Sequence, residues 1–390
     1  MNLYSQHKGF LLGVLLASFF CAFSLSSILG SVYIKHIIYL FVFAWLGFNL
    51  CLTTPRDKYS IEKALKLYIH TFIVLMSFYA LFSFYFEKVS TEIFIVNIVS
   101  LVLTNLVLLY SSKLKKMSLV TFEIFAYLFI TIYCFFIIKD FSIAYTELGN
   151  YLTATLPIGA CLVMSFIRSF DDELPLYLKV AAFILSLFFL FSLTQFMGRG
   201  SFVLSLFVTL IFLISNFNSI KRLVYGVFII FLVVIFYNVF ASQFTDSTLY
   251  KRLETLANGD VGERAYTYGQ LLYSLDFTTV LTGFGFGRTG FEVYGEKNYY
   301  PHNIHFHYLT ELGLIGFCFS LFFIWLCFFG FIKIFKRKLD ISSKLFFFMF
   351  LYVYFNFLKS FSMYDSWWLS LSAGLFLSSY FSSRGSDELV

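Results

Sequence analysis

Charged side chains are scarce in this sequence. Asp, Glu, Lys and Arg make up 13% of its 390 residues, whereas hydrophobic residues make up 59% and the mean hydropathy is +0.82. A soluble globular domain carries about 25% charged residues, so the composition excludes that class and predicts a chain that uses lipid as its solvent. Aromatic residues reach 23%, which suits lipid-facing surfaces and belts at the headgroups.

Cysteine is also sparse, and its distribution excludes two kinds of site. The six cysteines all lie within apolar runs; none pairs at the spacing of metal ligands, and none falls in the long polar segment where a disulfide would form. The net charge of +6 is spread over short connections and builds no dense basic face, which excludes a nucleic-acid binder. The sequence also contains no internal repeat of fixed period.

Apolar runs long enough to cross a bilayer dominate the chain. Since a spanning helix needs ~20 mostly apolar residues, we predict an all-α polytopic membrane protein with about 12 transmembrane helices. We interpret the first run as a retained span, because it is too long for the apolar region of a signal peptide. The sixth contains Thr, Pro and Gly residues that often mark a helix facing a cavity. The predicted spans are 10–30, 34–53, 67–86, 92–111, 119–138, 148–167, 177–195, 200–218, 223–241, 306–330, 344–358 and 366–382.

The basic residues predict the orientation. With a cytoplasmic N-terminus, most of the 28 Lys and Arg residues fall on the cytoplasmic side, so we expect both termini there. Residues 241–304, between the ninth and tenth spans, then form one large periplasmic loop, which separates spans one to nine in 1–240 from spans ten to twelve in 305–390. Within the loop, apolar residues recur at helical spacing over 263–275, which predicts an amphipathic helix on the membrane surface.

Three arginines gather at the outer face of this topology. Arg199 lies in Met-Gly-Arg-Gly-Ser, Arg264 in Gly-Glu-Arg-Ala-Tyr, and Arg288 in Gly-Phe-Gly-Phe-Gly-Arg-Thr-Gly. Topology disfavours Arg on that side, and several of them on one segment favour an anion site, because the guanidinium fork suits phosphate oxygens. The glycine-rich run lacks the Lys-Ser/Thr of a nucleotide loop, so we interpret it as tight turns that also let the backbone approach a ligand.

Three histidines lie at the start of the tenth span. His302, in Pro301-His302-Asn303, is near a helix N-terminus, where the dipole disfavours the imidazolium and leaves a neutral base. We expect His302 and His305 to share a helix face and His307 to point elsewhere; with no acidic cluster nearby, we predict no metal site. Glu311 follows inside the membrane, where a carboxylate is costly unless it is paired or lines a cavity.

The order of these motifs resembles the O-antigen polymerase and ligase superfamily of bacterial inner membranes. The resemblance rests on an Arg-Gly at the outer end of a span, an external loop with an Arg-containing helix, a Gly-Phe-Gly turn, and Pro-His-Asn followed by Glu-Leu-Gly-Leu-Ile-Gly, and it covers about residues 190–330. It implies an all-helical bundle in the inner membrane whose periplasmic face moves a glycan from undecaprenyl diphosphate to a sugar hydroxyl, with neither metal nor cofactor.

The resemblance also implies roles for individual residues. Arg199 and Arg264 would bind the diphosphate leaving group, and His302 would accept the proton of the attacking hydroxyl, with inversion at the sugar. The residues expected to contact the substrate are Arg288, Glu311, Tyr268 and Asn303.

Three functions stay open on the sequence. The Gly-Phe-Gly and Pro-His-Asn run favours a polymerase, which joins two undecaprenyl-diphosphate-linked oligosaccharides and whose partners would be these substrates, membrane lipid and a chain-length regulator. The alternative within the family is a ligase, which transfers the glycan to the lipopolysaccharide core. A transporter of lipid-linked oligosaccharides is the alternative of another class, but it is expected to place ionisable residues near mid-span, where this sequence has almost none.

Overall fold

The computed structural model describes residues 3–29, 32–52, 68, 71, 91–139, 151–195, 199–216, 263–295, 299–336 and 339–387. Within these ranges the chain is helical and contains no strand. The elements are α1 (Leu3–Phe20), α2 (Ala22–Ile28), α3 (Val32–Leu52), α5 (Thr91–Ser111), α6 (Lys116–Lys139), α7 (Tyr151–Arg168), α8 (Leu176–Thr194), α9 (Arg199–Asn216), α12 (Glu263–Ser274), α13 (Phe277–Thr282), α14 (Thr289–Tyr294), α15 (Ile304–Phe335), α16 (Ile341–Phe357), the 3-10 turn η2 (Met363–Asp365) and α17 (Trp367–Asp387).

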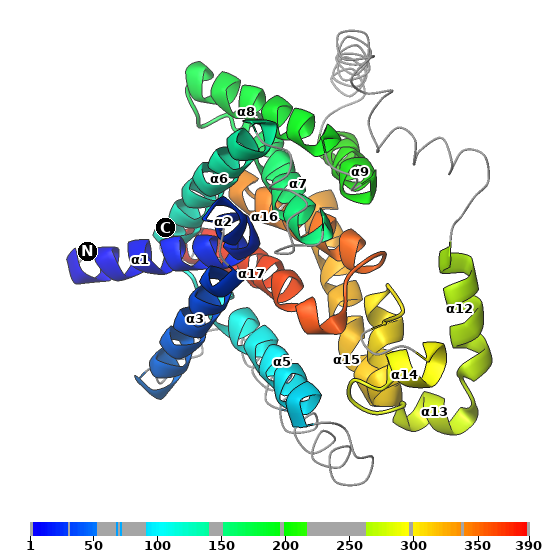
Figure 1. Cartoon of the computed structure of the whole chain (residues 1–390). Coiled ribbons are helices and arrows are strands. Elements are labelled where there is room, and N and C mark those ends of the chain that lie inside the picture. Colours follow the sequence, from blue (N-terminus) through cyan, green and yellow to red (C-terminus); the bar gives the residue numbers. More distant parts are fainter. Residues whose placement is uncertain are drawn as a thin grey trace.

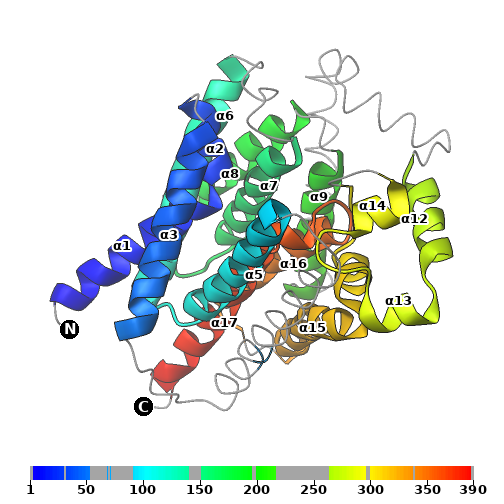
Figure 2. The same ribbon diagram turned by 60° about the horizontal axis from the view of Figure 1, so that its bottom comes forward.

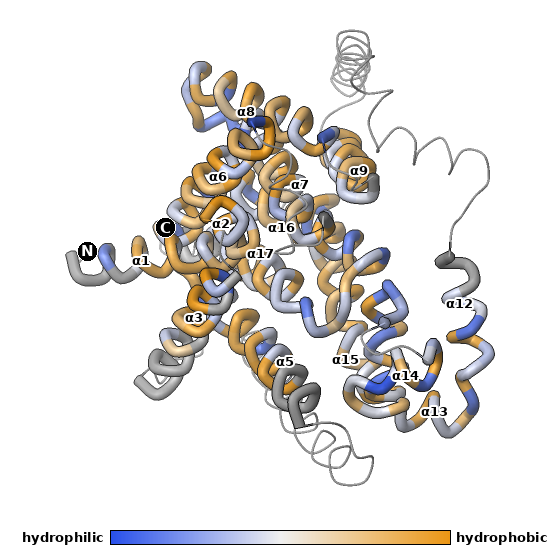
Figure 3. Tube along the Cα trace, viewed as in Figure 1, coloured by the Kyte–Doolittle hydropathy of each residue, from blue (hydrophilic) through white to orange (hydrophobic). Residues whose placement is uncertain are grey.

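The core of the bundle is built on α16 and α17 (Figure 1). Almost every side chain of α16 from Leu345 to Phe357 is buried, so this helix is apolar around its whole circumference. Its neighbours α7, α9, α15 and α17 cover it, while α5 packs on α17. The short helices α12–α14 lie beside α15 at one side of the bundle (Figure 2), and more hydrophilic residues run along them than along the bundle helices (Figure 3).

Several helices have the length and apolar character of membrane spans. In the described part of the chain, α6, α8 and α15 are long and apolar enough to cross a membrane, and a fourth span results if the bent pair Gly9–Phe20 and Ala22–Ile28, at 72°, crosses as one. Helices occupy the predicted spans except 67–86 and 223–241, which lie wholly or almost wholly outside the described residues. The all-α class and the apolar helices are therefore confirmed, whereas the number of twelve spans stays a prediction.

The polar residues of the sixth predicted span contact other helices. Thr155 Oγ1 of α7 lies 2.9 Å from Ser201 Oγ of α9, and Ser201 donates to Asn356 Oδ1 of α16 over 3.2 Å. Gly159 leaves room for the ring of Tyr352, which would collide with any Cβ at that position. Thr155 and Gly159 lie where α7 meets α9 and α16, so these two residues serve close helix packing.

A buried ion pair joins α6 to the end of α7. Arg168 donates from Nε to Glu123 Oε1 over 2.8 Å and from Nη2 to Glu123 Oε2, while its Nη1 donates to Asp171 Oδ2 over 2.8 Å. Tyr127 adds a hydrogen bond to Glu123 Oε1 over 3.1 Å. Both carboxylates are buried, and the two-pronged geometry is the arrangement that best offsets the cost of burying charge.

Candidate functional site

The polar residues of α15 lie on either side of a sharp reversal. Gly313 has φ 63° and ψ −156°, so the helix divides into an arm, Ile304–Leu312, and a span segment, Leu314–Phe335. His305 Nδ1 of the arm lies 2.7 Å from Ser320 Oγ of the span segment. Each of these residues is ~10 Å along its own segment from the reversal, so this contact requires the arm to fold back along the span segment as a hairpin. The predicted tenth span therefore begins with a folded-back arm.

The end of the arm meets the glycine loop, residues 283–290. The N–H of Phe284 donates to the Thr310 carbonyl over 2.6 Å, and the N–H of Gly285 donates to the Glu311 carbonyl over 3.2 Å. The last carbonyls of a helix have no partner within it. The glycine loop therefore supplies the hydrogen bonds that the reversal removes.

Two glycines make this close approach possible. A Cβ at Gly283 would collide with the Glu311 carbonyl, and a Cβ at Gly313 would collide with the Leu281 carbonyl. Both also have positive φ, which disfavours any other residue. The prediction of tight turns is thus confirmed; the further glycines of the loop with positive φ are Gly285 and Gly287.

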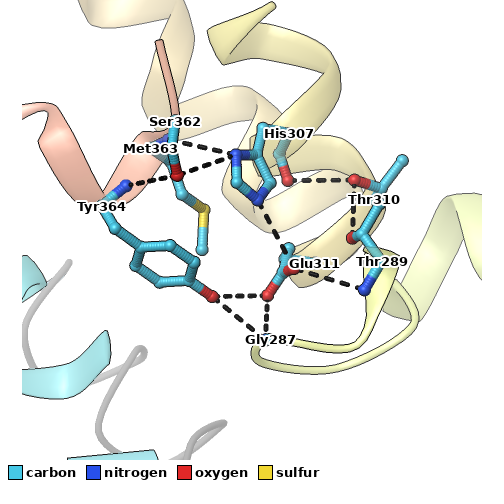
Figure 4. A network of polar contacts seen from close by, with 8 residues as sticks. All are labelled: Gly287, Thr289, His307, Thr310, Glu311, Ser362, Met363 and Tyr364. Carbon is cyan, nitrogen blue, oxygen red and sulfur yellow. Dashed lines mark hydrogen bonds and ion pairs between the residues drawn. The ribbon is translucent and has the colours of Figure 1, made fainter. Parts of the chain in front are cut away.

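The carboxylate of Glu311 accepts four hydrogen bonds or close polar contacts inside the protein (Figure 4). Its Oε2 accepts from the N–H of Gly287 and from the Tyr364 hydroxyl at 2.6 Å. Its Oε1 accepts from the N–H of Thr289 at 3.3 Å and faces His307 Nε2 at 3.4 Å. The side chain is only 2% exposed, and these donors replace the water lost on burial. The amides predicted to approach a ligand thus bind the protein's own carboxylate.

His307 connects Glu311 to the segment between α16 and α17. Its Nδ1 accepts the N–H of Met363 over 3.1 Å and lies 3.4 Å from Ser362 Oγ. A ring nitrogen that accepts an N–H carries no proton, so this network assigns the neutral tautomer with its proton on Nε2, towards Glu311. Burial and the Glu311 carboxylate raise the pKa of Tyr364 well above its ordinary value, so its hydroxyl stays a proton donor.

His302 occupies a strained position just before the arm. Its φ of 54° lies in the left-handed region, which residues other than glycine rarely adopt. Its ring centroid lies 5.7 Å from that of Tyr299 and 4.5 Å from that of Tyr300. The next residue, Asn303, caps the arm by accepting two N–H groups of the first turn. The surrounding contacts therefore hold His302 in a conformation that it would not choose alone.

The lead segment, residues 299–303, is fastened to the end of α16. The Tyr300 hydroxyl donates to the Ser360 carbonyl over 2.8 Å, and Asn303 Nδ2 donates to the Leu358 carbonyl over 3.1 Å. The side chain of Asn303, which we expected to contact substrate, therefore has three hydrogen-bond partners within the protein.

The start of α9 reaches the same end of α16. Arg199 is the first residue of α9, and the next residue, Gly200, packs against the Lys359 side chain, which would clash with any Cβ there. Lys359 lies between the two residues whose carbonyls hold the lead segment. The backbone of Arg199 therefore lies beside Leu358–Ser360, the residues that hold the lead segment with His302. The side chain of Arg199 lies outside the described residues.

Helix α12 approaches the lead segment from the other side. Thr267 Oγ1 lies 3.1 Å from the Tyr299 hydroxyl, and the ring of Tyr268 packs on Phe306 at 5.8 Å. Arg264 precedes Thr267 and Tyr268 by three and four residues, so its Cα is on the same side of α12. Its side chain also lies outside the described residues.

The apolar face of α12 is buried against protein only in part. The predicted helix over 263–275 is present, but Leu271 is fully buried and Tyr268 packs on the arm, while Leu272 is exposed. Part of this face therefore contacts the arm and α14, while Leu272 stays exposed, and the place of the helix on the membrane surface stays a prediction.

Arg288 has a partner within its own helix. It precedes α14 and donates from Nη2 to the Glu292 carboxylate one turn later. Both side chains are about one-third exposed, and ion pairs of this kind contribute little, so Arg288 can exchange Glu292 for another anion at small cost.

The three histidines have separate surroundings. His302 precedes the helix and does not share a face with His305, contrary to the prediction. His305 instead lies between Ser320 Oγ and the Tyr354 hydroxyl, 2.7 and 2.8 Å from its two ring nitrogens. Among the described residues, no three His, Cys, Asp or Glu side chains come together as a metal site.

Sequence reasoning missed His307 and Tyr364 as partners of Glu311. The spacing of four residues between His307 and Glu311 was an available signal, since it puts both on one face of a helix. Tyr364 gave no signal, because its contact with Glu311 depends on how α15 and η2 pack.

No protein-family model matches this chain, and no curated protein is similar enough to it to be a relative.

Proposed function

We propose that this protein is a membrane glycosyltransferase of the O-antigen polymerase kind, which extends a glycan at the periplasmic face of the inner membrane. The observation that carries the proposal is the neighbourhood of the lead segment. The lead segment contains His302 in a strained conformation. Helix α9, which starts at Arg199, begins beside Lys359 at the end of α16, and α12, which contains Arg264, contacts Tyr299. Strained residues held by their surroundings concentrate at functional sites.

The chemistry divides among these residues. The His302 imidazole takes the proton of an acceptor sugar hydroxyl, whose oxygen attacks the anomeric carbon of the donor glycan. The bond from that carbon to the diphosphate oxygen breaks, and undecaprenyl diphosphate leaves with the bonding electrons. Arg199 and Arg264 offset the charge that develops on the departing diphosphate. Arg288, whose surface partner is easily exchanged, is a further cation for it.

Glu311 takes a different role from the one expected at first. Its carboxylate is engaged by donors from three segments of the protein and is almost inaccessible. We therefore assign it to holding the glycine loop and the arm in place, and not to contact with substrate.

The decisive variant is His302→Asn, tested in cells that lack the native gene. Asn tolerates the left-handed conformation better than other non-glycine residues, so the substitution removes the base and keeps the backbone. The expected result is a loss of about 10²–10⁴-fold in chain extension, the usual contribution of a general base, so that the ladder of lipid-linked glycans collapses to single repeat units. Arg264→Ala is expected to give the same collapse.

The matched control is Asp172→Asn, which changes a fully exposed side chain in the connection between α7 and α8 and should leave the ladder intact. Long chains that accumulate on undecaprenyl diphosphate but do not reach the lipopolysaccharide core would make the protein a ligase instead. A wild-type ladder in well-expressed His302→Asn cells would refute the catalytic assignment.

A further inference from the structure

Helix α13 presents large apolar side chains to its surroundings. Phe277 is 79% exposed, and Leu281, one turn later on the same face, is also exposed. Just before them, at the end of α12, Leu272 is exposed and Tyr273 is 95% exposed. We call these four residues the apolar corner.

The other face of α13 is polar. Thr278 and Thr282 are exposed, and the Thr282 hydroxyl donates to the Thr278 carbonyl over 3.0 Å. Asp276 caps the helix by accepting the N–H of Thr279 over 2.7 Å. Apolar and polar residues thus take separate sides of α13, as in helices that lie along a membrane surface.

The apolar corner continues a second exposed apolar surface. Helix α13 packs on the reversal of α15, where the Leu281 carbonyl meets Gly313. Immediately after Gly313, the exposed side chains of the span segment recur every three or four residues and form one stripe along it. The large apolar members of this stripe are Leu314, Leu321, Trp325, Phe328, Ile332 and Phe335.

The position of this stripe identifies what covers it. The span segment belongs to a helix long and apolar enough to cross a membrane, so its exposed apolar stripe faces acyl chains. The apolar corner begins where the stripe ends, at the level at which a bilayer changes from acyl chains to headgroups. A single covering material, lipid, therefore suits both surfaces.

We propose that the apolar corner inserts into the lipid leaflet next to the span segment, with α13 lying along the bilayer surface. Because α13 leads directly into the glycine loop, the insertion would fix that loop at headgroup height. The proposal concerns where α13 lies and holds whatever reaction the protein catalyses.

The test uses the full chain in phosphatidylcholine vesicles, with its six native cysteines replaced and one new cysteine carrying the environment-sensitive fluorophore NBD. The apolar corner is probed with Phe277→Cys and, separately, with Leu281→Cys, which leaves Phe277 in place. Thr278→Cys is the matched control, since it lies on the polar face of the same helix, and Asp172→Cys reports a fully exposed position. Quenching is measured with lipids brominated in their acyl chains and with iodide equilibrated on both sides of the bilayer.

The expected result is a blue-shifted emission at 277 and 281, with stronger quenching by the brominated lipids than at 278 and weaker quenching by iodide. The reverse order is expected at 172. Quenching by iodide at 277 and 281 equal to that at 172 would overturn the proposal, because the corner would then be in water. Protection from both quenchers would overturn it too, because protein, such as a second copy of the chain, would then cover the corner.

Discussion

Replacement of Glu311 by Gln turns one oxygen of the buried carboxylate into an NH₂ group and removes its charge. In the wild type, each carboxylate oxygen of Glu311 faces two donors. An NH₂ in place of Oε1 would face the Thr289 N–H and the His307 Nε2–H, and each buried donor left without an acceptor costs about 1–3 kcal/mol. An NH₂ in place of Oε2 would face the Tyr364 hydroxyl, which can rotate and accept. We therefore expect Gln to adopt the second orientation.

When the Gln NH₂ takes the position of Oε2, Tyr364 determines how much stability the substitution costs. The Gly287 N–H keeps an acceptor, because the Tyr364 hydroxyl oxygen is 3.0 Å away. Glu311→Gln should then lose the extra strength of bonds to a charged group and the acceptor of the Tyr364 hydroxyl hydrogen, about 2–4 kcal/mol. Tyr364→Phe alone removes one donor from the carboxylate, at a cost of about 1–2 kcal/mol. In the double variant the new NH₂ and the Gly287 N–H face each other with no acceptor, which adds about 1–3 kcal/mol beyond the sum.

The assay is the apparent melting temperature of the purified full chain in detergent, measured for the wild type, both single variants and the double variant. The expected signature is a loss in the double variant larger than the two single losses together. Glu292→Gln is the matched control, because it makes the same substitution in an exposed ion pair and should change stability by less than about 0.5 kcal/mol. A cycle that is additive within about 0.5 kcal/mol would refute the proposed rotation of Tyr364.

Three further predictions concern stability. Arg168→Met should cost about 3–5 kcal/mol because it leaves Glu123 and Asp171 buried without their cation, and adding Glu123→Leu should recover the part of that loss due to Glu123; melting temperatures in which the double variant is the least stable would contradict this. Burial raises the pKa of Asp365 to about 6, so its ionisation destabilises the fold, and stability should fall as the pH rises from about 4 through 6. Asp365→Asn should lack this fall and exceed the wild type by about 3 kcal/mol at neutral pH, which melting curves at about pH 5 and about pH 8 would measure; the same pH dependence in both proteins would refute it. Gly313→Ala should cost more than about 2 kcal/mol, since it adds a collision and strain in a backbone region open essentially to glycine only, whereas Gly295→Ala adds milder left-handed strain in open space and should cost less; equal melting temperatures would refute this.

Local sequence patterns predicted the helices well, because each pattern reports on its own segment. The amphipathic helix predicted over 263–275 matches α12, and the positive φ of Gly283, Gly285 and Gly287 follows from a glycine-rich run. The reversal at Gly313 was not predictable in the same way. Its neighbours are apolar on both sides, so the arm and the span segment read as one continuous run.

The partners of Glu311 could not be predicted, because they depend on contacts distant in sequence. The Gly287 amide is separated from Glu311 by 24 positions and Tyr364 by 53. A lone carboxylate in an apolar run therefore predicted the need for partners but not their identity. The contact of Tyr268 with Phe306 was unpredictable for a similar reason, since an amphipathic pattern does not distinguish lipid from the apolar surface of the arm.

The hairpin of α15 has a consequence for the order in which the chain assembles during synthesis. The span segment makes its backbone hydrogen bonds within itself, so it can enter the bilayer alone. The arm cannot, because the Thr310 carbonyl and the Glu311 carboxylate have their partners in the glycine loop and in Tyr364. Tyr364 emerges from the ribosome after the arm and after α16. The arm must therefore wait at the membrane surface until the start of the last helix is made, and a nascent chain that stops before Met363 would have its spans in place but its arm undocked.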